Sequence, residues 1–403
     1  MPSRALLIVE PDFLNVHVGI RRISLYFWAR LLDRGYDVSV ATAGKDGLRL
    51  RETPPLAALE REIAAAEERN DEPAWTSGQP WTIGPDQQRD RRTLELPVAG
   101  TSPLIDLGGF DVSLVANPWL CVNGLPPGPV TVGVVADMVP NLLALGALRM
   151  DAFLDVYPFA RAHDVGYRLY LERAARICCI SESTRDDFRL VYRLDRMDQR
   201  PVVCIPYAHD PAREASPPRN RPQTPRILLV NVLDHRKNFS TIGRALASIA
   251  RGTPCELDVV GRERIPLADA SRFLQDLAAL GLPVRWFRGA SDACLQRLYA
   301  EADVLLFPSI YEGLGLPVLE AQSVGTPVVS SDSSSSVEIN RNVSLAVNPR
   351  DPGALVQKTL DVLLGRTDIL RGTALQHACE RYLSARNSID VFLPGSDCAA
   401  KAS

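Results

Sequence analysis

The stretch of the chain with the clearest chemical character is residues 306–320, which reads LFPSIYEGLGLPVLE. The apolar run that ends at Ser309 predicts a buried strand, the two glycines predict a turn, and Pro317 suits the first turn of a helix. Free backbone N–H groups at the start of such a helix favour a bound anion. Gly313 and Gly315 lack Cβ atoms, so a ligand can approach the main chain closely.

Two carboxylates flank this turn. Glu312 precedes the turn, and Glu320 lies on the predicted helix, with seven residues between the two. Each carboxylate has two acceptor oxygens, so both can bind hydroxyl groups of one molecule such as a sugar. Alternatively, Glu320 is a solvated helix residue and the glycines only shape the turn. Their combination in one strand–turn–helix favours a ligand site.

The rest of the chain supplies the elements that must position this turn. Short β-branched runs alternate with helical patterns, which is typical of βα units and parallel sheets. The predicted strands are residues 5–10, 37–42, 111–117, 130–137, 175–181, 201–206, 226–232, 255–261, 284–289, 302–309, 326–332 and 344–349. The predicted helices include residues 20–34, 181–193, 239–251, 267–280, 292–301 and 317–324.

A proline-rich segment divides this alternation into two halves. Residues 207–225 contain five prolines in 19 residues and no apolar periodicity, which is typical of a linker. We therefore expect an α/β protein with one domain over residues 1–206 and a second over residues 226–380. Ligands of such open sheets bind beyond the carboxyl ends of the strands, so we expect the site in the cleft between the domains.

Residues 45–105 fit the alternation less well. They contain a charged helical pattern over residues 56–70 and a Trp/Pro/Gly-rich stretch with Trp75 and Trp81. We interpret this segment as a surface excursion. Its aromatic residues form either a minor hydrophobic cluster or a contact with an acceptor molecule.

Composition excludes several classes of function. The net charge of −3 does not favour nucleic acid as a partner. No apolar run approaches the roughly 20 residues of a membrane-spanning helix, and the first residues lack a signal-peptide layout, so we expect a cytoplasmic protein. The eight cysteines show no CxxC spacing, so we expect buried, reduced thiols and no metal site.

At this point the chain resembles a known family. The pattern Pro-Ser-x-Tyr-Glu-Gly-Leu-Gly-Leu-Pro-x-x-Glu-Ala over residues 308–321 is similar to the hallmark of retaining glycosyltransferases of family 4 (group 1 glycosyl transferases), which have the GT-B fold of two Rossmann-like domains. The resemblance covers nearly all of residues 226–352. It includes residues 288–303 before the motif, residues 325–330, Glu338 and residues 347–351 after it, and a basic loop at residues 231–238.

The first half resembles the family more loosely. Gly19 and Ile20, followed by Arg22, are similar to a glycine-containing loop before the first helix. Residues 180–186 and 203–210 resemble the last helix–strand unit and the approach to the linker. The segment over residues 381–403 is similar to one that crosses back onto the first domain.

Two departures from the family pattern stand out. Ala136 occupies a position that is usually histidine near the donor sugar, which implies altered donor-site geometry or reduced activity. The basic loop lacks the glycine common before it and has Asn231 and Asp234 instead. Arg236 and Lys237 are retained.

The resemblance implies roles for individual residues. Arg236 and Lys237 neutralise the diphosphate of the leaving nucleotide, Glu312 orients the donor sugar as the catalytic residue, and Glu320 binds the ribose hydroxyls. The implied donor-binding set is Gly19, Arg236, Lys237, Ser309, Gly313, Leu314, Gly315, Leu316 and Glu320. Asp137 either contacts acceptor or donor or only caps the turn that follows it.

The implied reaction is retaining, metal-independent hexosyl transfer to a glycan or lipid-linked acceptor in surface polysaccharide synthesis. The form of the basic loop favours mannose from GDP-mannose, with a UDP-sugar as the other donor considered. Peripheral association with the inner membrane face is implied for lipid-linked acceptors. Two alternatives remain. The first is a catalytically silent nucleotide-sugar binder or partner subunit, which the presence of Ala136 favours. The second is a GT-B epimerase or phosphorylase.

Overall fold

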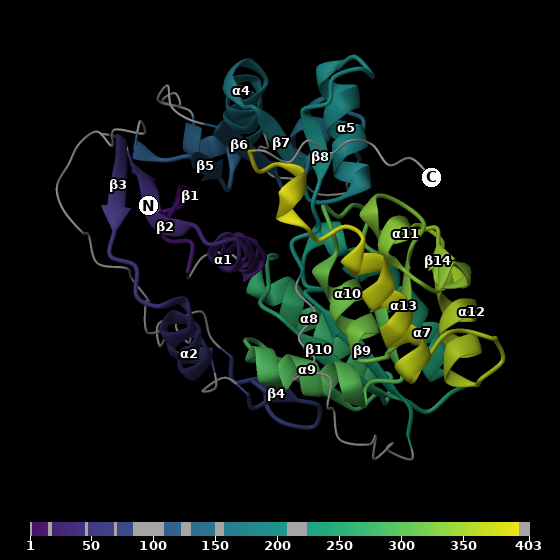
Figure 1. The fold of residues 1–403 in the computed structure, drawn as a ribbon. Helices are drawn as coiled ribbons and strands as arrows, with labels where there is room; N and C mark the ends of the chain where they lie inside the picture. The colour runs from purple at the N-terminus through teal and green to yellow at the C-terminus, as the bar shows by residue number, and fades with distance from the viewer. Residues whose placement is uncertain are drawn as a thin grey trace.

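The computed structural model describes residues 2–14, 18–44, 47–67, 71–83, 109–121, 130–149, 157–207 and 224–394. Over these residues the strands form two seven-stranded sheets, which lie in two lobes (Figure 1). The first sheet has the order β3-β2-β1-β5-β6-β7-β8 and the second the order β14-β13-β12-β9-β10-β11-β4. We call the parts built on these sheets the first lobe and the second lobe.

The strands of the first sheet are β1 (Arg4–Val9), β2 (Asp37–Gly44), β3 (Gly47–Arg51), β5 (Val112–Val115), β6 (Val130–Val135), β7 (Arg176–Cys179) and β8 (Pro201–Val203). Those of the second sheet are β4 (Trp75–Thr76), β9 (Arg226–Val230), β10 (Glu256–Val260), β11 (Val284–Phe287), β12 (Val304–Phe307), β13 (Val328–Ser331) and β14 (Ala346–Val347). Within the described residues, only the edge pairs β2–β3 and β4–β11 are antiparallel.

Helices cover the faces of both sheets (Figure 1). In the first lobe these are α1 (Val18–Asp33), α2 (Leu56–Glu67), α3 (Val139–Ala144), α4 (Tyr157–Arg173) and α5 (Glu182–Tyr192). In the second lobe they are α7 (Phe239–Ala250), α8 (Leu267–Ala279), α9 (Asp292–Glu301), α10 (Leu316–Ser323), α11 (Ser335–Ile339), α12 (Pro352–Leu363) and α13 (Gly372–Ser384).

The predicted alternation of strands and helices is confirmed. Each predicted strand has a counterpart whose ends differ by up to three residues, as element ends commonly do. The inner strands of both sheets, such as β5 and β12, are buried on both faces, so their apolar runs are nearly continuous. Ser181 is the N-cap of α5, where its side chain accepts a hydrogen bond from the N–H of Thr184. The prediction of a two-lobed α/β protein is therefore correct.

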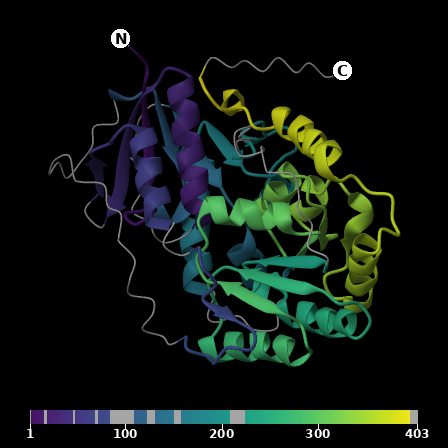
Figure 2. The ribbon, with the colours of Figure 1, turned by 90° about the horizontal axis from the view of Figure 1, so that it is seen from below.

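The interpretation of residues 71–83 as a surface excursion is wrong. β4 pairs antiparallel with β11 and so adds an edge strand to the second sheet. Figure 2 shows β4 lying beside that sheet. Trp75 is buried, and the ring of Trp81 stacks on Trp286 with 5.7 Å between ring centroids. Asp71 accepts hydrogen bonds from the N–H and hydroxyl of Ser291, the N-cap of α9. Both tryptophans belong to the second lobe's hydrophobic core, which covers their apolar rings.

The end of the described chain returns to the first lobe, as the resemblance implied. After α13 the chain passes through η7 (Ile389–Val391) and packs beside α1 (Figure 2). The ring of Phe392 lies 5.8 Å from that of Phe27, and Asp390 forms an ion pair with Arg34. The N–H of Ile205 donates to the carbonyl of Arg386 at 2.9 Å, which joins this segment to the end of β8.

Two predictions based on composition also have structural counterparts. Seven cysteines lie among the described residues, and all seven are buried and free of disulfides. Burial raises the pKa of several of these thiols, for example that of Cys255 to about 11. No helix in the described ranges has the length and apolar character needed to cross a bilayer. The predicted linker falls almost entirely outside the described residues, and the domain boundaries stay a prediction.

Candidate active site

The glycine turn after β12 has the predicted strand–turn–helix geometry. Gly315 is the N-cap of α10 with φ of +86°, a left-handed conformation that glycine adopts without a steric penalty. Pro317 then occupies the first helical turn, where its missing N–H costs no hydrogen bond. Among the described residues, none accepts a hydrogen bond from the main-chain N–H of Gly313 or Leu314. These donors lie ahead of a helix start, which is the setting in which proteins bind anions.

Glu312 forms a buried cluster with the basic loop. Its Oε1 lies 2.5 Å from Nζ of Lys237, and its Oε2 lies 3.1 Å from Nη1 of Arg236. Arg236 also donates to the carbonyl of Tyr311 at 3.2 Å. Lys237 and Glu312 are each less than a tenth exposed, so water screens their interaction poorly. The structure thus brings Glu312 together with Arg236 and Lys237, which precede it in the sequence by 76 and 75 positions.

The pKa values of this cluster follow from burial and from its two cations. Burial would raise the pKa of Glu312, but the charges of Arg236 and Lys237 outweigh it and lower that pKa, with help from a Ser309 hydrogen bond. Burial is the largest influence on Lys237 and lowers its pKa to about 8, although Glu312 opposes the shift. The cluster therefore carries a net positive charge at neutral pH. That charge suits a bound diphosphate.

The conformation of the basic loop explains how it tolerates Asn231 and Asp234 in place of the glycine that is common in the family. Asn231 has φ of +55°, in the left-handed region that asparagine tolerates better than most residues other than glycine. Asp234 caps the short helix η5 (His235–Lys237) by accepting from the N–H of Arg236 at 2.8 Å. Asn238 donates to the carbonyl of Pro308 at 3.1 Å, which attaches the loop to the strand end beside Glu312. Both replacements thus hold the basic pair in place.

Glu320 occupies the second acidic position, and its partner comes from the opposite lobe. It lies on α10, buried, with Oε2 2.7 Å from the hydroxyl of Tyr299. Its Oε1 forms an ion pair with Arg22 of α1, and Arg22 also pairs with Asp292. Burial would lower the pKa of Arg22, but these two carboxylates raise it. Sequence reasoning assigned no role to Arg22; its only signal was a basic residue one turn after Gly19.

Gly313 joins the turn to the first lobe. Its carbonyl accepts hydrogen bonds from the hydroxyls of Ser181 and Thr184, at 2.6 and 2.9 Å. A Cβ atom at Gly313 would lie 2.0 Å from the carbonyl oxygen of Ala136, which no side chain can do without movement of one lobe. Position 313 thus requires glycine, because the backbone of Ala136 occupies the space that a side chain would need. Ala136, at the position that is usually histidine in the family, therefore lies against the turn.

The remaining predicted residues are placed as follows. Asp137 accepts from the N–H of Val139 at 3.0 Å, so it caps the start of α3, and its contact with a ligand stays a prediction. Gly19 lies in the first turn of α1, exposed, because the helix begins two residues before its predicted start, and the role of Gly19 at the donor stays a prediction. Helix α1 includes Gly19 because the helical conformation is continuous over residues 18–33. Ser309 and Leu314 are buried around Glu312, and Leu316 begins α10.

Comparison with known proteins identifies the second lobe. Residues 212–381 match the family model described as "Glycosyl transferases group 1". This part of the chain is therefore similar to group 1 glycosyl transferases. Glu312, Glu320, Arg236 and Lys237 all lie within the matched residues.

Two curated proteins illustrate what the chain is similar to. O-antigen chain mannosyltransferase B of Escherichia coli is 40% identical over 80 residues, which are 20% of this chain and 21% of that protein. Glycogen synthase of Mycobacterium tuberculosis is 26% identical over 370 residues, or 89% of this chain and 86% of that protein. The chain thus spans well under half the length of the first of these relatives and most of the second.

Solved structures show that the complete chain has the GT-B fold. Anabaena HepE, solved in complex with UDP-glucose, superposes with a TM-score of 0.58 at 13% sequence identity. The superposition covers 95% of this chain and 97% of that one. The predicted fold, with two lobes of the Rossmann type, is confirmed.

Proposed function

We propose that the protein is a retaining glycosyltransferase that moves a hexose from a nucleotide-sugar to a glycan or lipid-linked acceptor. The observation that carries the proposal is the buried cluster of Glu312, Arg236 and Lys237 beside the glycine turn at the junction of the lobes. It combines two cations, a carboxylate and free main-chain donors in one place. A sugar diphosphate requires this combination of groups.

Each side chain has a separate role in the proposed reaction. Arg236 and Lys237 bind the diphosphate, whose negative charge grows as the glycosidic bond breaks, so they stabilise the transition state more than the ground state. Glu312 accepts hydrogen bonds from the donor sugar and orients its anomeric carbon. In the absence of donor, the ion pairs hold both cations charged and in place, so little rearrangement is needed on binding.

The proposed chemistry takes place on one face of the sugar. The bond between the anomeric carbon and the phosphate oxygen breaks, and the acceptor oxygen forms its bond on the same face. The leaving phosphate oxygen takes the acceptor's proton, so the products are the glycoside and a nucleoside diphosphate. The cluster supplies charge stabilisation without a protein nucleophile, and its two cations perform the neutralisation that a divalent metal performs elsewhere.

For the donor we propose GDP-mannose, with a UDP-sugar as the other candidate. Similarity to an O-antigen chain mannosyltransferase supports mannose and a role in polysaccharide synthesis. The likeness of the fold to a protein solved with UDP-glucose is the reason to keep UDP-sugars in the test. For the acceptor we propose a saccharide, free or lipid-linked at the inner face of the membrane.

A donor screen tests the proposal. GDP-, UDP-, ADP- and dTDP-sugars are added to the purified protein, and the melting temperature and the hydrolysis of each donor are measured. A donor present at about 100 times its dissociation constant should stabilise the fold by about 2.7 kcal/mol. The anomeric configuration of the transferred sugar, read by NMR, should equal that of the donor. Inversion, or no stabilisation by any of the four nucleotide classes, would contradict the proposal.

A catalytically silent nucleotide-sugar binder is the second candidate. Two observations favour it: Ala136 replaces the usual histidine beside Gly313, and Glu320 already has Arg22 as a partner. Replacement Ala136→His separates the two candidates. A silent protein should bind the donor without turnover and gain activity on this replacement, whereas an active enzyme should turn over as it stands.

A further inference from the structure

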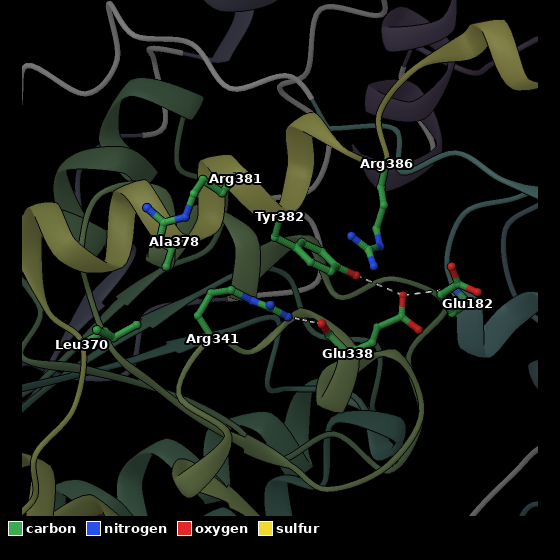
Figure 3. Close-up of a pocket in the computed structure, with 8 residues that line it drawn as sticks. All are labelled: Glu182, Glu338, Arg341, Leu370, Ala378, Arg381, Tyr382 and Arg386. Carbon is green, nitrogen blue, oxygen red and sulfur yellow. Dashed lines mark hydrogen bonds between the residues drawn. The ribbon is translucent and has the colours of Figure 1, made fainter. Parts of the chain in front are cut away.

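A cavity lies away from the Glu312 cluster, where the lobes meet near the end of the described chain. It encloses about 590 Å³, a volume typical of small-molecule sites. Its lining, shown in Figure 3, consists of Glu182, Glu338, Arg341, Leu370, Ala378, Arg381, Tyr382 and Arg386. Glu182 comes from α5 of the first lobe and the other residues from α11, α13 and the segments next to them. The residues assigned to the donor site do not line it.

Three arginines give this cavity its character. Ala378, Arg381 and Tyr382 lie three and four positions apart on one face of α13. The guanidinium carbons of Arg341 and Arg386 lie 4.0 and 4.6 Å from the centre of the Tyr382 ring. The Tyr382 ring keeps the guanidinium groups of Arg341 and Arg386 close to each other, because both contact this one rigid aromatic side chain.

The two carboxylates of the lining have their hydrogen-bond and ion-pair partners elsewhere on α5. Glu338 accepts hydrogen bonds from the N–H groups of Glu182 and Ser183, at 3.0 and 2.8 Å, so it caps α5 across the lobe boundary. Glu182 forms an ion pair with Arg185 on its own helix. Across the described part of the chain, no carboxylate forms an ion pair with Arg341, Arg381 or Arg386. The lining therefore has three arginines against two carboxylates, which leaves an excess of positive charge.

We propose that this cavity binds a phosphate-bearing small molecule that bridges the two lobes. Guanidinium groups match phosphate oxygens in pairs of hydrogen bonds, and three of them line the space. Leu370 and Ala378 add an apolar portion to the lining, which suits an organic phosphate. Because Glu182 of α5 is part of the lining and the arginines come from the second-lobe side, a ligand held here lies beside both lobes.

Titration calorimetry with inorganic pyrophosphate tests the proposal on the full chain. Pyrophosphate also suits the donor site, so Lys237→Gln is used as the background that weakens binding there. In this background we expect one remaining site, and the added changes Arg341→Gln and Arg386→Gln should weaken it at least tenfold. The matched control replaces the exposed Arg168 and Arg272 by glutamine and should leave that site unchanged. Loss of all pyrophosphate binding in Lys237→Gln alone would overturn the proposal.

A second variant guards against a folding defect. Arg341 donates to the carbonyls of Glu338 and Ile339, so its replacement can disturb α11. Ala378→Phe retains the three arginines and fills the cavity, and it should also weaken binding at least tenfold with an unchanged melting temperature. Binding unaffected by this filled cavity would contradict the proposal.

A vesicle assay distinguishes a soluble phosphate from a lipid head group. The protein is sedimented with phosphatidylglycerol vesicles, and with phosphatidylcholine vesicles as the control. If the ligand is a soluble phosphate, replacement of Arg341 and Arg386 should not change the amount of protein that sediments with the vesicles. Sedimentation that does depend on them would assign the same phosphate chemistry to a lipid head group and overturn the assignment to a small molecule.

Discussion

Lys237 and Glu312 form a buried ion pair, with 2.5 Å between Nζ and Oε1, across the join between the basic loop and the glycine turn. The pair belongs to a triad, since Arg236 contacts the other oxygen of Glu312. Two cations and one anion leave a net positive charge in a buried place. This relationship makes the site suitable for a diphosphate, and it can be tested one charge at a time.

Replacement of Lys237 by glutamine should remove part of the diphosphate site. Arg236 still pairs with Glu312, so we expect the fold to survive. Groups that stabilise developing charge in this way typically contribute about 10²–10³ in kcat, so turnover should fall by about a hundredfold. Steady-state kinetics with the best donor measures this, with the exposed Arg272→Gln as the control. A fall of less than threefold would show that Lys237 does not bind the leaving group.

The low pKa of Lys237 predicts a pH dependence of donor binding. Burial lowers this pKa from 10.5 to about 8, so the free protein loses the charge above pH 8 and donor affinity should fall, by up to about tenfold per pH unit. Between pH 8 and 10.5 the unfolded state binds more protons than the folded state, so the contribution of Lys237 to the free energy of unfolding rises with pH. Titration calorimetry and chemical denaturation measure the two effects.

The matched control for this pH dependence is Lys237→Arg. Arginine stays protonated throughout the range, so affinity should become constant between pH 7 and 10. A wild-type affinity that is constant over the same range would contradict the assignment of the titration to Lys237.

Replacement of Glu312 by glutamine tests whether this carboxylate supports catalysis without acting as a nucleophile. The change leaves Arg236 and Lys237 together without their anion, so we expect a loss of about 3 kcal/mol in the free energy of unfolding. The value of kcat should fall more than the KM for the donor rises. Added azide should not restore activity; formation of a glycosyl azide, seen by mass spectrometry, would show that Glu312 forms a covalent bond.

Replacement of Gly313 by alanine should disturb the contact between the lobes. The new Cβ would lie 2.0 Å from the carbonyl oxygen of Ala136, so the turn or the lobe must move, at a typical cost of about 1–3 kcal/mol. Donor turnover should fall with it because the hydrogen bonds from Ser181 and Thr184 weaken. Gly252→Ala is the control, since no atom lies within 4 Å of its added Cβ. Equal stability of the two variants would contradict the packing described here.

Removal of the Arg22 side chain tests the contact between α1 and α10. Arg22→Gln leaves Glu320 buried with only Tyr299 as a partner, which should cost about 3 kcal/mol. The double variant Arg22→Gln with Glu320→Gln should lose less free energy of unfolding than the two single variants lose together, because it has no unpaired Glu320 charge. Chemical denaturation measures all four proteins. Additive effects would mean that the ion pair contributes nothing to stability.

Much of this site could be predicted from local sequence. The strand, turn and helix around Glu312 depend on an apolar run, two glycines and a proline that lie within a few residues of each other. The basic loop was also recognisable, and its missing glycine is replaced by Asn231 in the same left-handed conformation. Arg22 could not be assigned, because nothing near it in the chain indicates that Glu320 is its partner.

By itself the sequence determined the alternation of strands and helices, the glycine turn and the charged groups around it, because periodicity and backbone preference act between near neighbours. Only the tertiary structure decided that Trp75 lies in the second sheet, that Glu338 caps α5, and that Gly313 meets the backbone of Ala136. These contacts join residues more than 150 positions apart. They depend on how the two lobes pack, which no local pattern records.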